Sequence, residues 1–109
     1  MTTISTEGDC ATLINVFTVE PDRAAELADL LTDATERVMR FLPGFRSANI
    51  HVSTDGTRVT NYAQWADEHA FRAMLDDPAA RDHMGKAAAL AVSFDPHFYT
   101  VHSVHERTT

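Results

Sequence analysis

The chain has 109 residues, of which 44% are hydrophobic and 23% are charged, the balance expected of one soluble globular domain. It carries 16 Asp and Glu against 9 Lys and Arg, and the net charge of −7 argues against binding to nucleic acid or to a membrane surface, since both need a basic face. One cysteine, Cys10, excludes an internal disulfide and any multi-cysteine metal site. No apolar stretch is long enough to span a membrane and the N-terminus does not resemble a signal peptide, so we expect a cytoplasmic protein.

The first half of the chain predicts a strand and a helix behind a short lead. Residues 1–10 are small and polar, and we expect a flexible lead to a domain that spans residues 11–105. Residues 11–19 are rich in β-branched and aromatic side chains, which predicts a strand. Apolar side chains then recur at helical spacing over residues 23–41, and we expect them to face the core: Leu27, Leu30, Leu31, Ala34, Val38 and Phe41.

Pro43 and Gly44 end this helix, and a hairpin follows. Strand patterns over residues 45–53 and 58–65 are separated by Asp55-Gly56, a strong turn signal. If the loop comprises three residues, with Gly56 left-handed in a bulge, residues of odd number such as His51 share the face of Asn61 and Trp65. A two-residue loop places Ile50 there instead. We favour the three-residue loop because it separates a polar-lined face from an apolar one.

The last part of the chain predicts two helices and a strand. Asp67 can cap a helix whose apolar stripe comprises Ala70, Phe71 and Met74, and Pro78 suits the first turn of another helix that ends near residue 90. Pro96 precedes a final strand over residues 97–104.

The order of elements predicts an α+β, ferredoxin-like βαββαβ fold with an antiparallel four-stranded sheet. Two helices are expected to cover one face of the sheet. The other face is expected to be too apolar for water, which predicts a homodimer. Its expected residues are Ile14, Val16, Ala48, Ile50, Val52, Tyr62, Tyr99 and Val101.

Several common kinds of site are absent from the sequence. The 6 histidines show no metal-ligand spacing, and neither a glycine-rich nucleotide loop nor a Gly-x-Ser-x-Gly nucleophile motif occurs. Asn61 is a better candidate, because asparagine is disfavoured inside a strand and a buried amide is costly unless it is hydrogen-bonded. Trp65 shares its face, so the two residues are expected to line one pocket.

The runs Ser53-Thr54-Asp55-Gly56-Thr57 and Asn61-Tyr62-Ala63-Gln64-Trp65 resemble the antibiotic biosynthesis monooxygenases. The similarity includes Pro43-Gly44-Phe45 and Ala70-Phe71-Arg72, and it covers residues 11–90.

The resemblance implies a dimeric α/β-barrel and a cofactor-independent monooxygenase that uses no flavin, haem or metal. Its expected reaction, in antibiotic biosynthesis, is oxidation of a polycyclic aromatic polyketide, from anthrone to quinone, by dioxygen. The family's catalytic asparagine and tryptophan fall on Asn61 and Trp65, and its strand histidine falls on His51. A proton-relaying tyrosine of the family falls on Phe71 and an arginine falls near Met84, so the relay is either replaced by His83 or lost. We therefore expect His51, Phe71, His83 and Asn15 to bind substrate.

Two other functions are compatible with this fold. Haem-degrading relatives have an asparagine on the first strand, which Asn15 matches, but Met74 and Met84 stand where their tryptophan and histidine belong. A non-catalytic dimeric ligand-binding or accessory protein of a polyketide pathway is the stronger alternative, and the changes at Phe71 and Met84 favour it.

Overall fold

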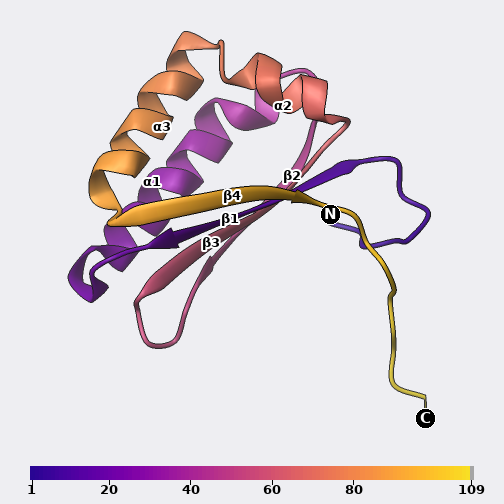
Figure 1. The fold of residues 1–109 in the computed structure, drawn as a ribbon. Helices are drawn as coiled ribbons and strands as arrows, with labels where there is room; N and C mark the ends of the chain where they lie inside the picture. The colour runs from indigo at the N-terminus through magenta and orange to yellow at the C-terminus, as the bar shows by residue number, and fades with distance from the viewer. Residues whose placement is uncertain (109) are drawn as a thin grey trace.

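The computed structural model describes residues 1–108, which form one sheet with helices on one side (Figure 1). The elements in chain order are β1 (Ala11–Thr18), a 3₁₀ turn (Pro21–Arg23), α1 (Ala24–Arg37), a second 3₁₀ turn (Met39–Phe41), β2 (Phe45–Val52), β3 (Arg58–Trp65), α2 (Glu68–Met74), α3 (Pro78–Leu90) and β4 (Ser93–Tyr99). No helix within residues 1–108 is long and apolar enough to cross a membrane.

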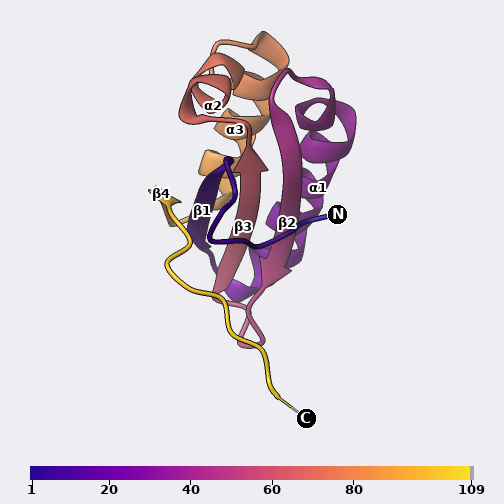
Figure 2. The same ribbon diagram turned by 90° about the vertical axis from the view of Figure 1, so that its right-hand side faces the viewer.

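The four strands are antiparallel and lie in the order β2-β3-β1-β4, and the helices pack against one face (Figures 1 and 2). This order confirms the predicted α+β, ferredoxin-like fold. Because β1 and β3 are central, their helix-facing side chains form the floor of the interior. Two buried clusters fill it, and Leu27 and Val59 are fully buried within one of them.

The hairpin register differs from the prediction. Ile50, not Asn49, lies opposite Asn61, so His51 lies on the face of the sheet away from the helices. The Ser53 N–H donates to the Arg58 carbonyl, which leaves a loop of four residues, 54–57, with Gly56 left-handed as expected.

The Asp55 carboxylate organises this loop. It accepts hydrogen bonds from the Thr57 N–H and from the Ser53 and Thr57 hydroxyls, and these bonds lower the pKa of Asp55 to about 2.

A bulge at the start of β2 changes which residues of this strand face the helices. The pairing shifts between Phe45 and Ser47, so Phe45 lies opposite Trp65 and on the same face. Ala48 and Ile50, predicted for the open face, instead pack against the helix-side core.

The open face is therefore less apolar than predicted. Ile14, Val16, Tyr62 and Tyr99 have the parity of that face, but Ser47, Asn49, His51 and Gln64 accompany them. Part of the lead lies across this face: the Asn49 amide donates to the Thr2 hydroxyl at 2.6 Å, and the Gln64 amide donates to the Thr3 carbonyl at 2.7 Å.

Two further predictions at element ends are wrong. The α-helix ends at Arg37, and the following 3₁₀ turn buries Met39 while Phe41 is 73% exposed beneath the Arg40 guanidinium. The last strand spans Ser93–Tyr99 and includes Pro96. A proline is tolerated there because β4 is an edge strand, so its missing N–H costs no hydrogen bond to an outer neighbour.

Gly44 lies directly before β2, packs against α2 and cannot be replaced without strain. Its φ is +84°, and a Cβ at this position would overlap Ala70 Cβ of α2. We expect Gly44→Ala to lower the free energy of unfolding by about 2 kcal/mol or more, measured by urea denaturation. Gly85→Ala is the control: a Cβ there meets nothing within 4 Å, and the variant should gain about 0.5–1 kcal/mol because alanine favours the helix. Equal stability of the two variants would contradict this assignment.

Candidate active site

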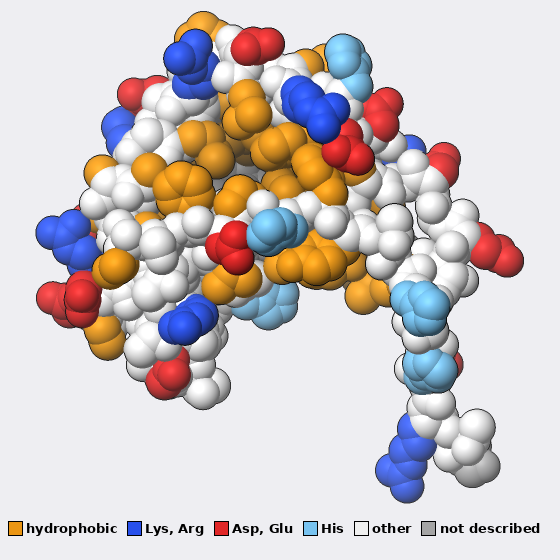
Figure 3. Space-filling model, viewed as in Figure 1, with side chains coloured by type: hydrophobic (Ala, Val, Ile, Leu, Met, Phe, Trp, Pro, Cys, Tyr) orange, Lys and Arg blue, Asp and Glu red, His pale blue; other side chains and the backbone are white. Residues whose placement is uncertain are grey.

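A cavity of about 250 Å³ lies between the helices and the sheet. Its floor comes from β1, β2 and β3 and its roof from α1, α2 and α3, while Phe94 and Pro96 of edge strand β4 lie at its margin. Figure 3 shows hydrophobic side chains gathered around this hollow, between the helices and β4. Phe94 is 52% exposed, so the cavity opens to solvent along this edge.

Two asparagines form the polar part of the floor. Asn15 of β1 and Asn61 of β3 are directly paired across the two strands, and both side chains line the cavity. Paired residues on one face have Cβ atoms about 4.5–5.5 Å apart, so the two amides act on the same region of a bound molecule.

The two amides differ in their hydrogen bonds. The Asn15 oxygen accepts from the Asp95 N–H at 3.2 Å, which fixes that oxygen towards β4 and leaves the NH2 group for a ligand. The Asn61 oxygen is buried and has no hydrogen-bond partner among residues 1–108. A half-turn about the Cβ–Cγ bond exchanges the oxygen and nitrogen of this amide, so Asn61 can present a donor or an acceptor. A buried unpaired amide is costly, and a ligand that pairs with it recovers that cost.

Aromatic side chains form one wall. Trp65 is only 3% exposed and contacts the edges of two rings, with centroid distances of 5.4 Å to Phe45 and 6.1 Å to Phe71. Phe71 in turn meets Phe98 at 5.3 Å. This chain of edge-to-face contacts fixes a flat, apolar surface beside the asparagine pair.

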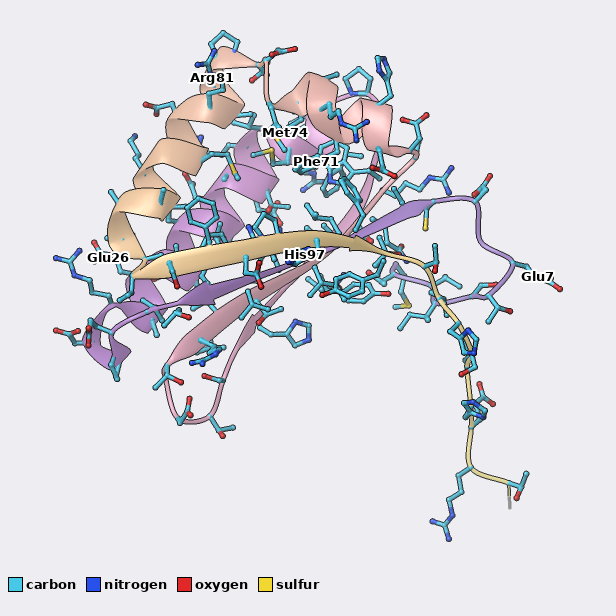
Figure 4. All side chains as sticks on the ribbon, in the orientation of Figure 1. Glu7, Glu26, Phe71, Met74, Arg81 and His97 are labelled. Atoms are coloured by element: carbon cyan, nitrogen blue, oxygen red, sulfur yellow. The ribbon has the colours of Figure 1, made fainter. Side chains whose placement is uncertain are left out.

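The roof contains flexible side chains. Met39, Met74 and Met84 line the cavity, and Figure 4 shows Met74 and Phe71 extending from α2 towards the sheet. Sites for drug-sized ligands usually occupy about 300–1,000 Å³, so the cavity is slightly small for a multi-ring molecule. Methionine rotamers adjust easily, and the roof can therefore widen around such a ligand.

The structure brings together Asn61, Trp65, Asn15 and Phe71, but it does not bring either predicted histidine to the cavity. His51 is exposed on the opposite face, with Nδ1 3.2 Å from the Asn49 carbonyl. His83 lies on the side of α3 that faces α1, with Nε2 3.5 Å from Asp33 Oδ2 and Nδ1 3.0 Å from the Ala79 carbonyl. In the described part of the chain, no three His, Cys, Asp or Glu side chains gather in a way that could hold a metal ion.

Phe94, Pro96 and Thr35 are among the lining residues that were not predicted as site residues. Phe94 and Pro96 were missed because the last strand was expected to begin after Pro96, although the alternation of Phe94, Pro96 and Phe98 marks one face of a strand. Thr35 lines the cavity from α1, and its hydroxyl donates to the Leu31 carbonyl. It was missed because a lone threonine on a helix carries no site signal.

Comparison with known proteins identifies the family of the chain. The sequence profile described as "Antibiotic biosynthesis monooxygenase" matches residues 11–86. Tetracenomycin-F1 monooxygenase of Streptomyces glaucescens is 51% identical over 83 residues, which cover 76% of this chain and 74% of that protein.

Solved structures share the fold. The monooxygenase ActVA-Orf6 of Streptomyces coelicolor, in complex with nanaomycin D, is 31% identical with a TM-score of 0.81, over 91% of this chain and 93% of that one. SnoaB, a cofactor-independent oxygenase from Streptomyces nogalater, is 26% identical with a TM-score of 0.74, over 89% and 97% of the two chains. On the family profile and these relatives, this chain belongs to the antibiotic biosynthesis monooxygenase family.

Proposed function

We propose that this protein is a cofactor-independent monooxygenase that oxidises a polycyclic phenolic anthrone to a quinone with dioxygen. The observation that carries the proposal is the asparagine pair, with its unpaired Asn61 oxygen, on the floor of a mainly apolar, aromatic cavity. The names of the relatives support it, because they are monooxygenases and one was solved with nanaomycin D.

The chemistry needs little from the protein. An anthrone CH2 loses a proton to give an enolate, and the enolate gives one electron to dioxygen. The radical and superoxide then combine, so that a C–O bond forms, and protonation gives a hydroperoxide. Loss of the second C–H proton breaks the O–O bond and releases water, which leaves the quinone C=O. One oxygen atom enters the product and the other enters water.

The two amides suit the charged step of this sequence. Negative charge gathers on the ring oxygen when the enolate forms, and the NH2 groups of Asn15 and Asn61 can donate to it in a cavity lined mainly by apolar side chains. Trp65 and Phe71 provide flat surfaces for the rings. The buried aromatic wall holds the substrate while the floor stabilises its anion.

The test is incubation with an anthrone under air and under nitrogen. We expect the protein to accelerate oxygen uptake and quinone formation in equal amounts, with one atom of ¹⁸O2 in the product. Binding without acceleration would overturn the oxygenase proposal and favour an accessory ligand-binding protein instead.

The open face of the sheet is the proposed homodimer interface. Ile14 and Tyr62 lie next to each other on it, and no helix of residues 1–108 covers them. We expect light scattering to give a mass about twice the 12.1 kDa of one chain. Ile14→Lys should shift the mass towards one chain. Phe41→Lys, at an equally apolar but exposed residue on the helix side, should remain dimeric, and a monomeric wild type would contradict the assignment.

A further inference from the structure

We infer that the protein provides no acid or base for its reaction, and that it therefore acts on substrates that ionise by themselves near neutral pH. This inference rests on the proposed function and restricts its substrate class. Within residues 1–108, the side chains that line the cavity include no Asp, Glu, His, Lys, Arg, Cys or Tyr. Their only polar groups are the amides of Asn15 and Asn61, the Trp65 indole N–H and the Thr35 hydroxyl. None of these accepts a proton at ordinary pH.

No charged group of the helices that form the roof lines the cavity, and several of these groups pair with one another. On α1, Asp33 pairs with Arg37 and faces His83 of α3. On α2, Arg72 pairs with Glu68 at 3.0 Å, in a pair that is more than half exposed.

The other charged side chains of α3 also lie away from the cavity. Lys86 pairs with Asp82 at 3.1 Å, again in solvent. Arg81 lies at the end of the helix distant from β4 (Figure 4).

The charged side chains of β4 and β2 also lie away from the cavity. On β4, His97 and Asp95 pair at 2.7 Å and alternate with Phe94, Pro96 and Phe98, which have the parity of the helix side. On β2, Arg46 pairs with Asp9, and this contact lowers the pKa of the Asp9 carboxyl.

The remaining titratable side chains of the sheet point to the open face or lie at its end. His51 and Tyr62 have the parity of the open face. Arg58 is at the exposed start of β3, where it donates to the Thr57 hydroxyl. No element around the cavity therefore directs a charge into it.

The absence of a charge has a definite consequence for a bound phenol or carbon acid. Transfer into an apolar cavity raises its pKa, whereas a cation within about 4–6 Å would lower it by about 1–3 units. The amides offset the first effect only in part, since each is a neutral donor. The protein thus selects substrates that are already acidic, such as anthrones with hydroxyl groups beside the carbonyl, and the proton goes to water or to the substrate's own phenolate.

The test compares the pH dependence of kcat/KM between pH 5 and 10 for anthrone and its 1,8-dihydroxy derivative. We expect kcat/KM to rise by about tenfold per pH unit up to a midpoint that differs between the substrates by the difference of their own pKa values. His83→Ala should leave both midpoints unchanged. One midpoint shared by both substrates, or one removed by His83→Ala, would overturn the inference.

A second measurement does not need turnover. The phenolate of 2-hydroxyanthraquinone absorbs at longer wavelength than the phenol, so the pKa of the bound molecule can be read from its spectrum. We expect this pKa to be equal to or higher than that of the free quinone. A decrease of one unit or more would reveal a cation or base at the ligand and overturn the inference. If neither anthrone consumes oxygen, the proposed function fails, and the spectrum still decides this inference.

Discussion

Asn61→Ala is expected to lower kcat by roughly 10²–10³-fold, the usual effect of removing one well-placed donor to a developing oxyanion. Asn61 is the member of the asparagine pair whose oxygen has no partner among the described residues, so its amide is free to turn its NH2 towards a ligand. Asn15 is held by the Asp95 N–H and retains its own donor in the variant. The loss should therefore appear mainly in kcat, measured from initial rates of oxygen uptake, with a smaller effect on KM.

The variant should fold normally. Alanine removes a buried amide oxygen that has no hydrogen-bond partner among the described residues, so the free energy of unfolding should be unchanged or slightly higher. Asn49→Ala is the matched control, because Asn49 lies on neighbouring strand β2 but faces the open side, where its amide bonds to Thr2 and Tyr62. Similar rates for wild type and Asn61→Ala would remove Asn61 from the active site.

The fold was predictable because its signals are local. Alternation marks the strands, the Asp67 side chain accepts the Ala70 N–H as a cap, and Pro78 begins α3 as expected. The hairpin register was not predictable in the same way. It depends on whether Ser53 and Arg58 pair, and the choice follows from hydrogen bonds to the Asp55 carboxylate that a turn motif does not specify.

The candidate site likewise has features that follow from the local sequence and features that depend on the tertiary structure. Asn61 and Trp65 lie two pleats apart on one strand, so their common face follows from the sequence alone. That Asn15 stands opposite Asn61 depends on the order and register of the sheet. The direction of His83 depends on the packing of α3 against α1, because a small rotation of a helix decides whether a side chain faces a cavity or a neighbouring helix.

Trp65→Phe is expected to raise KM several-fold while kcat changes little. Trp65 is nearly buried and makes edge contacts with Phe45 and Phe71, so it fixes the aromatic wall rather than a proton or a charge. Phenylalanine keeps part of that surface and loses the rest, which weakens binding of the rings to the ground state and the transition state alike. Steady-state rates over a range of anthrone concentrations separate the two constants.

Trp65→Ala gives a different result, because the residue also supports the core around Leu13 and Met74. Removal of a buried tryptophan side chain costs about 3–5 kcal/mol, a large part of the stability of a small domain, so this variant should unfold at much lower urea. Phe98→Leu is the control for the aromatic wall. This variant loses the ring contact with Phe71 but keeps the contacts of Trp65 with Phe45 and Phe71, so its KM should rise less than that of Trp65→Phe. If instead Trp65→Phe lowers kcat and kcat/KM equally, the indole acts in the transition state, and its N–H becomes a third donor beside the two asparagines.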